Sequence, residues 1–173
     1  YQTPPKSYPI NAIRMNFLDN HDENSWGRNI ISHFGQNLYP LVTMIFTLPG
    51  MPMIYSGQEA KSNKQLRFFD KDTIPWDDVP DSKFYQELIN LRKGHKVFWN
   101  TNHNLEFMGS LPPGLVGFKR WTKDATYHIV VNLSDQDQEL DPGLIAGSML
   151  FSDGISQKTT IARHGYLVCK ENR

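Results

Sequence analysis

The sequence has few of the features that would assign it to a class of protein at once. Its 18 Lys and Arg residues balance 18 Asp and Glu residues, so no charge excess favours a nucleic acid or an anionic membrane as a partner. The single cysteine, Cys169, excludes an internal disulfide framework and is more typical of a buried, inert thiol than of a nucleophile. No apolar run reaches the roughly 18 residues that a membrane-spanning helix requires.

Common catalytic and nucleotide-binding motifs are also missing. The chain contains no GxGxxG, P-loop, HExxH or GxSxG pattern, and the spacing of His21, Asp22 and His33 fits neither a zinc site nor an EF-hand. A hydrophobic fraction of 39% with 12% aromatic residues is ordinary for a globular protein and argues against disorder. The length of 173 residues allows one domain or two small ones.

The first half of the chain alternates between strand-like and helix-like patterns. Short apolar runs at residues 10–18 and 51–55 predict strands, and apolar residues at helical spacing predict helices at 38–48 and about 82–96. Residues 60–80 have neither period and are expected to form an irregular loop. The order strand, helix, strand, helix is typical of parallel βα units, so this half predicts an α/β structure.

Beyond Trp99 the period changes to that of short strands. Residues with turn chemistry, such as Asp153-Gly154 and His164-Gly165, separate these runs. The predicted strands are 115–122, 126–134, 147–153, 158–162 and 165–171. Strands at this spacing without helices suggest a small antiparallel sandwich. We therefore expect an α/β part at 1–98 and an all-β part at 99–173, with the boundary near residues 97–101.

A dense group of polar residues follows the first predicted strand, in the stretch FLDNHDENSWGR at 17–28. Loops converge at the carboxyl ends of parallel strands, so functional sites form there. A carboxylate beside an imidazole, such as Asp22 beside His21, can serve acid/base catalysis, stabilise a developing cation or bind a metal. The alternative is a polar loop with capping acids, and these residues by themselves do not decide between the two.

Two further groups of residues have a structural and a functional interpretation. Gln58 and Glu59 end the second predicted strand, where such residues are more often structural than catalytic. Aromatic residues could stack on sugar rings, but at these densities they more often belong to a core. The aromatic residues concerned are Trp26, Phe68, Phe69 and Trp76.

Two segments resemble signature sequences of the α-amylase superfamily of retaining glycoside hydrolases. IRMNFLDNHDENSWGR is similar to the segment that closes the seventh strand of the family's TIM barrel, with the pattern F-[LV]-x-N-H-D. GMPMIYSGQE is similar to the eighth strand, G-x-P-x-[IL]-Y-x-G-x-E. RFFDKDTIPWDD resembles the segment that commonly follows, and residues 102–170 resemble the family's small C-terminal β-sandwich. The matched positions are Phe17, Leu18, Asn20, His21, Asp22, Gly50, Pro52, Ile54, Tyr55, Gly57 and Glu59.

The resemblance implies roles for four residues. Asp22 corresponds to the carboxylate that stabilises the oxocarbenium-like transition state, and His21 would bind a hydroxyl of the same sugar. Asn20 would stabilise the loop that carries these substrate-binding residues. Arg28 would correspond to an arginine that the family often carries after the motif. Asp19 occupies a variable position and receives no role. The resemblance implies no cofactor and no metal ligand in this chain, and leaves calcium in a longer parent protein open.

The family's nucleophile and acid/base segments do not occur in this chain. Retaining hydrolysis needs two carboxyl groups about 5 Å apart across the glycosidic bond, and in this family they come from the fourth and fifth strands. A complete TIM barrel needs about 250 residues. The resemblance thus implies a partial TIM barrel, the last two βα units, followed by a small antiparallel β-sandwich.

The expected function follows from this partial match. The chain would be the C-terminal part of an α-glucan hydrolase of the α-amylase, neopullulanase or cyclomaltodextrinase type, and it would be inactive alone. Its expected partners are an α-glucan or maltooligosaccharide, the missing N-terminal barrel portion, and a second copy through exposed barrel edges. The alternatives are a transglycosylase of the same superfamily, a non-catalytic carbohydrate-binding or assembly module, and a purely structural domain at the end of a chain.

Overall fold

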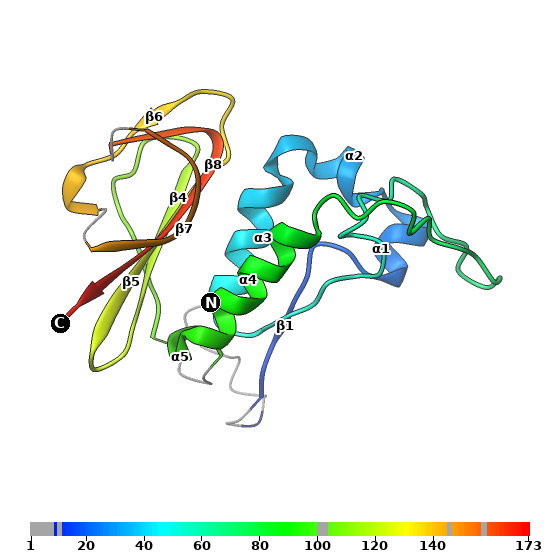
Figure 1. Ribbon diagram of the computed structural model, residues 1–173, viewed down its shortest axis with the longest axis horizontal. Coiled ribbons are helices and arrows are strands. Elements are labelled where there is room, and N and C mark those ends of the chain that lie inside the picture. Colours follow the sequence, from blue (N-terminus) through cyan, green and yellow to red (C-terminus); the bar gives the residue numbers. More distant parts are fainter. Residues whose placement is uncertain (1–8, 10–11, 100–103, 145–146, 157–158) are drawn as a thin grey trace.

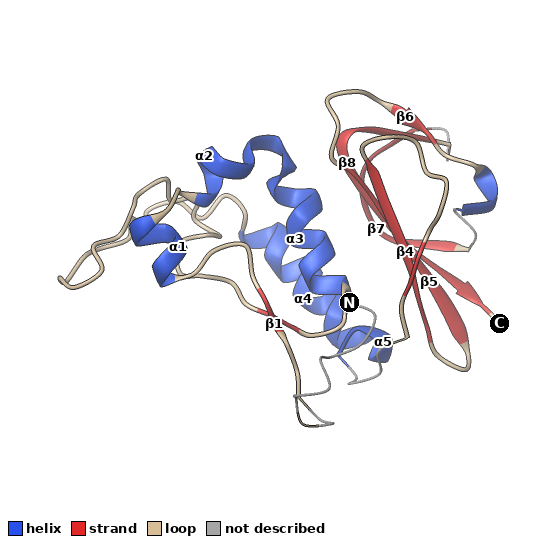
Figure 2. Ribbon diagram, turned by 180° about the vertical axis from the view of Figure 1, so that it is seen from behind, coloured by secondary structure: helices blue, strands red, loops and turns tan. Residues whose placement is uncertain are grey.

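The computed structural model describes residues 9, 12–99, 104–144, 147–156 and 159–173. A group of helices with a short parallel strand pair lies on one side, and a curled antiparallel sheet lies on the other (Figure 1). Seen from behind, α3 and α4 lie between the β1 segment and this sheet (Figure 2). No helix among the described residues has the length and apolarity that a membrane span requires.

The two strands predicted in the first half pair with each other. β1 (Met15–Asn16) runs parallel to β2 (Met51–Pro52), with Met15 opposite Met51. Two further backbone bonds frame the pair, from the Met51 N–H to the Arg14 carbonyl and from the Met53 N–H to the Asn16 carbonyl. The predicted parallel arrangement is confirmed, although the regular pairing is shorter than the apolar runs, and residues 10 and 11 lie outside the described part of the chain.

Both predicted helices are confirmed, and the structure adds shorter ones. α3 (Leu38–Thr47) buries residues on most of its surface, including two threonines. The Thr43 and Thr47 hydroxyls donate to carbonyls of the preceding turn, so their burial leaves no unpaired donor. The predicted helix at 82–96 is divided at His95 into α4 and α5. The remaining helices are α1 (His21–Trp26), α2 (Ile30–Phe34), the 3₁₀ helix η1 (Gly35–Asn37), α4 (Ser82–Gly94) and α5 (Lys96–Trp99).

The second half forms one six-stranded antiparallel sheet. Its strands are hydrogen-bonded in the order β3-β4-β5-β8-β6, and β7 also pairs with β8. The predicted antiparallel pairing is confirmed, and a short 3₁₀ helix, η2 (Pro142–Leu144), lies between β6 and β7. The strands are β3 (Glu106–Phe107), β4 (Leu115–Trp121), β5 (Ala125–Asn132), β6 (Gln138–Glu139), β7 (Ser148–Ser156) and β8 (Thr160–Asn172).

Two predicted turns in this half are irregularities within strands. Gly154 lies inside β7 with φ of 68°, and His164 lies inside β8 with φ of 58°. The pairing register shifts between Asp153 and Ile155 at this place. The predicted strands 158–162 and 165–171 are therefore one strand, β8, which begins at Thr160; Thr159 lies in the preceding turn, and residue 158 lies outside the described residues. Turn chemistry indicated backbone with positive φ, which some types of bulge require as well as some reversals.

The strands of the curled sheet have two buried faces. Ile129 and Val168 face the helices and belong to a core with α3, α4 and α5, whereas Val130 and Leu167 line the inside of the curl. The side chain of Arg120 on β4 connects the two layers. It is fully buried and donates to the carbonyls of Thr47 and Val97. Because helices and sheet share one core, the division into two domains at residues 97–101 stays a prediction.

Candidate functional site

The polar stretch after β1 begins a helix. The Asn20 side chain accepts a hydrogen bond from the Glu23 N–H, with an O–N distance of 2.8 Å, and so caps the N-terminus of α1. Asp22 and Glu23 lie in the first turn, where negative charge is favourable. The alternative interpretation of this stretch as a polar loop with capping acids is wrong in two respects: residues 21–26 form a helix, and its cap is the amide of Asn20 rather than an acid.

His21 and Asp22 lie together on the surface. The His21 Nε2 and Asp22 Oδ2 atoms are 3.6 Å apart, and the two side chains are 65% and 64% exposed. In the described part of the chain this is the only hydrogen bond or ion pair of the Asp22 carboxylate. The capping alternative requires Asp22 to accept backbone N–H groups. Asp22 instead presents a solvent-facing carboxylate beside an imidazole.

Asp19 has a structural role that the sequence did not reveal. It is 3% exposed, and its carboxylate accepts from the Asn20 N–H at 2.9 Å and from Asn24 Nδ2 at 3.3 Å. Burial raises the pKa of Asp19, and the Asn24 hydrogen bond opposes that shift. Asn24, also buried, accepts from the Leu66 N–H at 2.8 Å. These contacts fix α1 to the loop that follows β2, and no local sequence signal predicts them.

The end of the second strand lies against the end of the first. A small cavity of about 10 Å³ lies where they meet, and its lining includes Asp19 and Asn24 from the first segment and Gly57 and Gln58 from the second. Gln58 is 3% exposed and donates to the Tyr85 hydroxyl at 2.6 Å, and burial raises the pKa of Tyr85. Gln58 is thus structural, as residues of this kind usually are. The two motif segments meet at the carboxyl edge of the strand pair.

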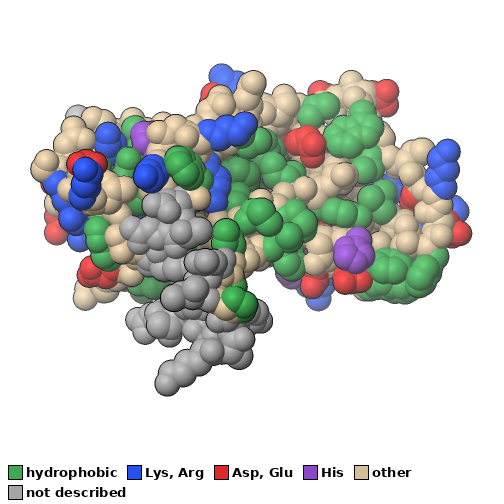
Figure 3. Space-filling view, turned by 90° about the horizontal axis from the view of Figure 1, so that it is seen from below, with side chains coloured by type: hydrophobic (Ala, Val, Ile, Leu, Met, Phe, Trp, Pro, Cys, Tyr) green, Lys and Arg blue, Asp and Glu red, His purple; other side chains and the backbone are tan. Residues whose placement is uncertain are grey.

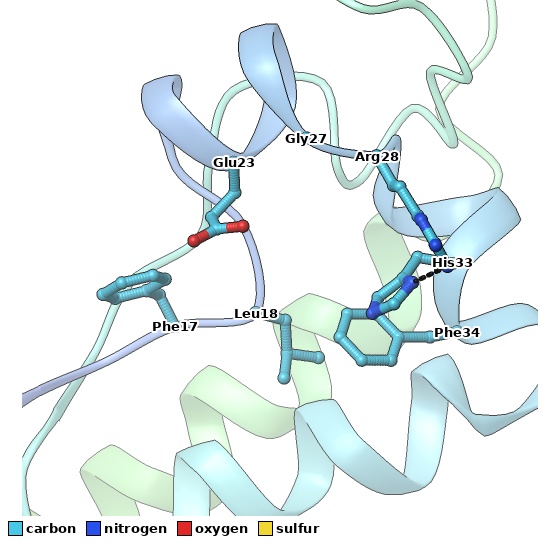
Figure 4. A pocket seen from close by; sticks show the side chains of 7 residues that line it. All are labelled: Phe17, Leu18, Glu23, Gly27, Arg28, His33 and Phe34. Carbon is cyan, nitrogen blue, oxygen red and sulfur yellow. Dashed lines mark hydrogen bonds between the residues drawn. The ribbon is translucent and has the colours of Figure 1, made fainter.

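Arg28 lies in a different place from His21 and Asp22. It lines a hollow of about 460 Å³ between α1, α2 and the 17–18 segment (Figure 4). Arg28 Nη1 lies 3.5 Å from His33 Nδ1, and Glu23 points into the same hollow. The complete lining is Phe17, Leu18, Glu23, Gly27, Arg28, His33 and Phe34. The four predicted site residues therefore do not share one cavity: Asn20 caps α1, His21 and Asp22 form an exposed pair, and Arg28 faces the hollow.

Among the described residues, no group of three or more His, Cys, Asp or Glu side chains is placed to hold a metal ion. The site therefore consists of hydrogen-bonding and charged side chains. Such an arrangement can bind hydroxyl groups and stabilise positive charge.

No protein-family model and no curated protein sequence matches the chain. Solved structures match it in fold. An α-amylase from Lactobacillus plantarum has a TM-score of 0.70 at 20% identity, covering 95% of this chain and 40% of that one. A debranching enzyme from Nostoc punctiforme has a TM-score of 0.67 at 18% identity, covering 89% and 33%. A trehalose-6-phosphate hydrolase from Bacillus licheniformis has a TM-score of 0.65 at 17% identity, covering 92% and 43%.

These matches define the class of fold. The chain is built like part of the α-amylase-family structures, and it spans less than half the length of each of these three. The resemblance first seen in the two motifs is confirmed at the level of the fold. At these identities the comparison concerns the fold alone, and the activity of the chain's parent protein is a separate question.

Proposed function

We propose that this chain is the C-terminal part of an α-glucan-acting glycoside hydrolase that cleaves α-glucosidic bonds with retention. One observation carries the proposal: the β1–β2 pair brings the His21–Asp22 segment and the Gly57–Glu59 turn to one carboxyl edge. That edge is where parallel α/β barrels form their sites. The fold shared with α-amylase-family structures supports the same class of enzyme.

In this proposal Asp22 contacts the sugar at the point of cleavage. Its exposed carboxylate accepts hydrogen bonds from sugar hydroxyls and stabilises the positive charge that develops in the oxocarbenium-like transition state. His21, at 3.6 Å from Asp22, donates to a hydroxyl of the same sugar. Asn20 places both side chains by capping α1. Arg28 acts from the neighbouring hollow, where its guanidinium lies beside His33.

The nucleophile and the acid/base come, in this proposal, from an N-terminal barrel portion that completes the strand pair. The first strand segment supports this with an exposed apolar face. Ile13, Met15 and Phe17 are 55%, 49% and 40% exposed, and Met51 on β2 is 49% exposed. Figure 3 shows hydrophobic side chains gathered across the middle of the lower face of the molecule. Further barrel strands would pair with the open edges and cover these residues.

The test is Asp22→Asn in the complete polypeptide that carries this chain. Loss of one preorganised transition-state contact should lower kcat/KM for a maltooligosaccharide by a factor on the order of 10² to 10³. The melting temperature should stay unchanged, because a side chain that is 64% exposed contributes little to packing. Glu139→Gln, an exposed carboxylate on β6, is the matched control. Near-normal activity of the Asp22 variant would contradict its role.

The same measurement separates the enzyme from its alternatives. Turnover of an α-glucan by the complete polypeptide would exclude a non-catalytic binding module and a purely structural domain. Comparing released reducing sugar with newly formed oligosaccharide would then separate a hydrolase from a transglycosylase. A complete polypeptide without any glucan turnover would overturn the proposed function.

A further inference from the structure

Three aromatic side chains form an exposed cluster beside His21. Trp26, Phe68 and Phe69 are 65%, 37% and 84% exposed. Their ring centroids lie 5.4 Å apart for Trp26–Phe68 and 4.8 Å apart for Phe68–Phe69, and the His21 ring lies 5.5 Å from that of Phe68. The expectation that these aromatics belong to a core is wrong. Figure 3 shows hydrophobic side chains beside a histidine at the α1 end of the molecule.

The loop that carries Phe68 and Phe69 is closed by Asp72. The Asp72 carboxylate accepts from the Arg67 N–H at 3.1 Å and from the Thr73 N–H at 2.8 Å, and it pairs with the Lys64 ammonium. Lys64 also donates to the Thr73 carbonyl at 3.0 Å. These bonds tie the two sides of the loop together at its base.

The same loop is attached to α1, which carries Trp26. Gln65 Nε2 donates to the Gly27 carbonyl at 2.9 Å, and the Leu66 N–H donates to Asn24 Oδ1 at 2.8 Å. The three rings are therefore held in position before any ligand arrives. A surface that is ordered in advance loses little conformational entropy on binding.

We propose that Trp26, Phe68 and Phe69 form a stacking platform for a second glucose unit of an α-glucan, adjacent to the unit held by His21 and Asp22. This inference rests on the proposed function. A pyranose ring has apolar C–H faces and a rim of hydroxyls. The aromatic rings would cover a face, while the exposed His21 and Asp22 side chains bind the rim of the neighbouring unit.

The geometry favours a sugar chain over a protein segment as the occupant. The platform is continuous with His21 through the Phe68 contact, and His21 in turn contacts Asp22. The apolar rings are thus directly adjacent to exposed polar side chains, which have no other polar partner among the described residues. A repeating sugar chain offers the same alternation of apolar face and hydroxyl. A packed protein segment would leave the Asp22 carboxylate buried against an apolar surface, which is unfavourable.

The test is calorimetric titration of the chain with maltoheptaose. Phe69→Ala and Trp26→Ala should each weaken binding about tenfold, the loss expected when one large apolar contact is removed. Phe107→Ala, which is 46% exposed on β3 at the edge of the antiparallel sheet, is the matched control and should bind like the wild type. Because Phe69 is 84% exposed, its replacement should leave urea unfolding unchanged.

Each outcome decides one of the two proposals. If Asp22→Asn weakens maltoheptaose binding while Phe69→Ala and Trp26→Ala do not, the platform is overturned and the proposed function stands. If the aromatic replacements destabilise the complete polypeptide without changing glucan binding, the rings contact protein and the platform is overturned. A wild-type chain that binds no maltoheptaose also overturns the platform, whereas glucan turnover by the complete polypeptide decides the proposed function separately.

Discussion

Replacement of Arg120 tests whether helices and sheet form one cooperative unit. Arg120 is fully buried, and its guanidinium donates to the carbonyls of Thr47, Val97 and Asn104 at 2.8, 2.7 and 2.7 Å. Burial, with a smaller contribution from Arg92, lowers the pKa of Arg120 to about 10, so the group stays charged at neutral pH. Its three bonds join the end of α3, the α5 helix and the segment before β3.

The size of the effect follows from those bonds. A hydrogen bond to a charged group contributes about 1.5–3 kcal/mol, and each buried carbonyl left without a donor costs about 1–3 kcal/mol. Desolvation of the guanidinium offsets part of this sum. Arg120→Met keeps the apolar stem and removes the donors, so we expect a loss of about 3–5 kcal/mol in the free energy of unfolding. Arg120→Lys should lose nearly as much, because one ammonium cannot reproduce the planar fork of donors.

Urea unfolding followed by circular dichroism measures this loss. Arg163→Met, at an exposed position on β8, is the matched control and should stay within about 0.5 kcal/mol of the wild type. If Arg120→Met unfolds within about 1 kcal/mol of the wild type in a single transition, the buried guanidinium does not hold the layers together. Two separate transitions in the wild type would show that helices and sheet unfold independently, which contradicts a shared core.

Three further outcomes are expected. The isolated chain should not hydrolyse a chromogenic maltoside, because a transition-state carboxylate cannot replace the nucleophile and acid; turnover above a blank, with contaminating amylase excluded, would contradict this. The chain should self-associate through its exposed apolar strand face, and the double change Met15→Ser and Met51→Ser should shift sedimentation towards the monomer. Hydrogen bonds from Lys64 and from backbone N–H groups lower the pKa of Asp72 from 3.8 to about 2. Its contribution to the order of the loop is therefore present above pH 3.8 and lost as the pH falls towards 2. Cleavage of this loop by pepsin, measured at each pH relative to cleavage of the Asp72→Asn chain, should rise as the pH falls over that interval.

Period and turn chemistry predicted the main elements, because they depend on local sequence. The apolar runs predicted the β1–β2 pair, and helical spacing predicted α3 and the whole of α4, but not the break at His95 that begins α5. The same turn chemistry misled at Gly154 and His164. Positive φ is compatible with a reversal or with a bulge, and only the cross-strand register between β7 and β8 distinguishes them. Pairing across strands is a long-range property that a local pattern does not contain.

The burial of Arg120 is a second long-range effect. On β4 it follows Lys119, and the pair looks like ordinary polar positions on a strand. Alternation along β4 places Phe118 and Arg120 on the side of the helices. Arg120 is accommodated there because the carbonyls at the ends of two helices and the carbonyl before β3 need donors at that point. The sequence shows the arginine, but it does not show that three carbonyls distant along the chain lie within hydrogen-bonding reach of it.

Asp19 and Asp22 show why composition alone did not locate the site. They are the same residue type, three positions apart, at the end of the same strand. Asp19 precedes the helix cap, so its side chain turns inward, where its two carboxylate oxygens accept hydrogen bonds from the Asn20 N–H and the Asn24 amide. Asp22 follows the cap, so the first turn of α1 directs it outward beside His21. A group that must meet a substrate needs unoccupied acceptor capacity at the surface. Asn20 sets where the helix begins. The carboxylate of Asp22 is therefore exposed at the surface, whereas that of Asp19 is buried and hydrogen-bonded.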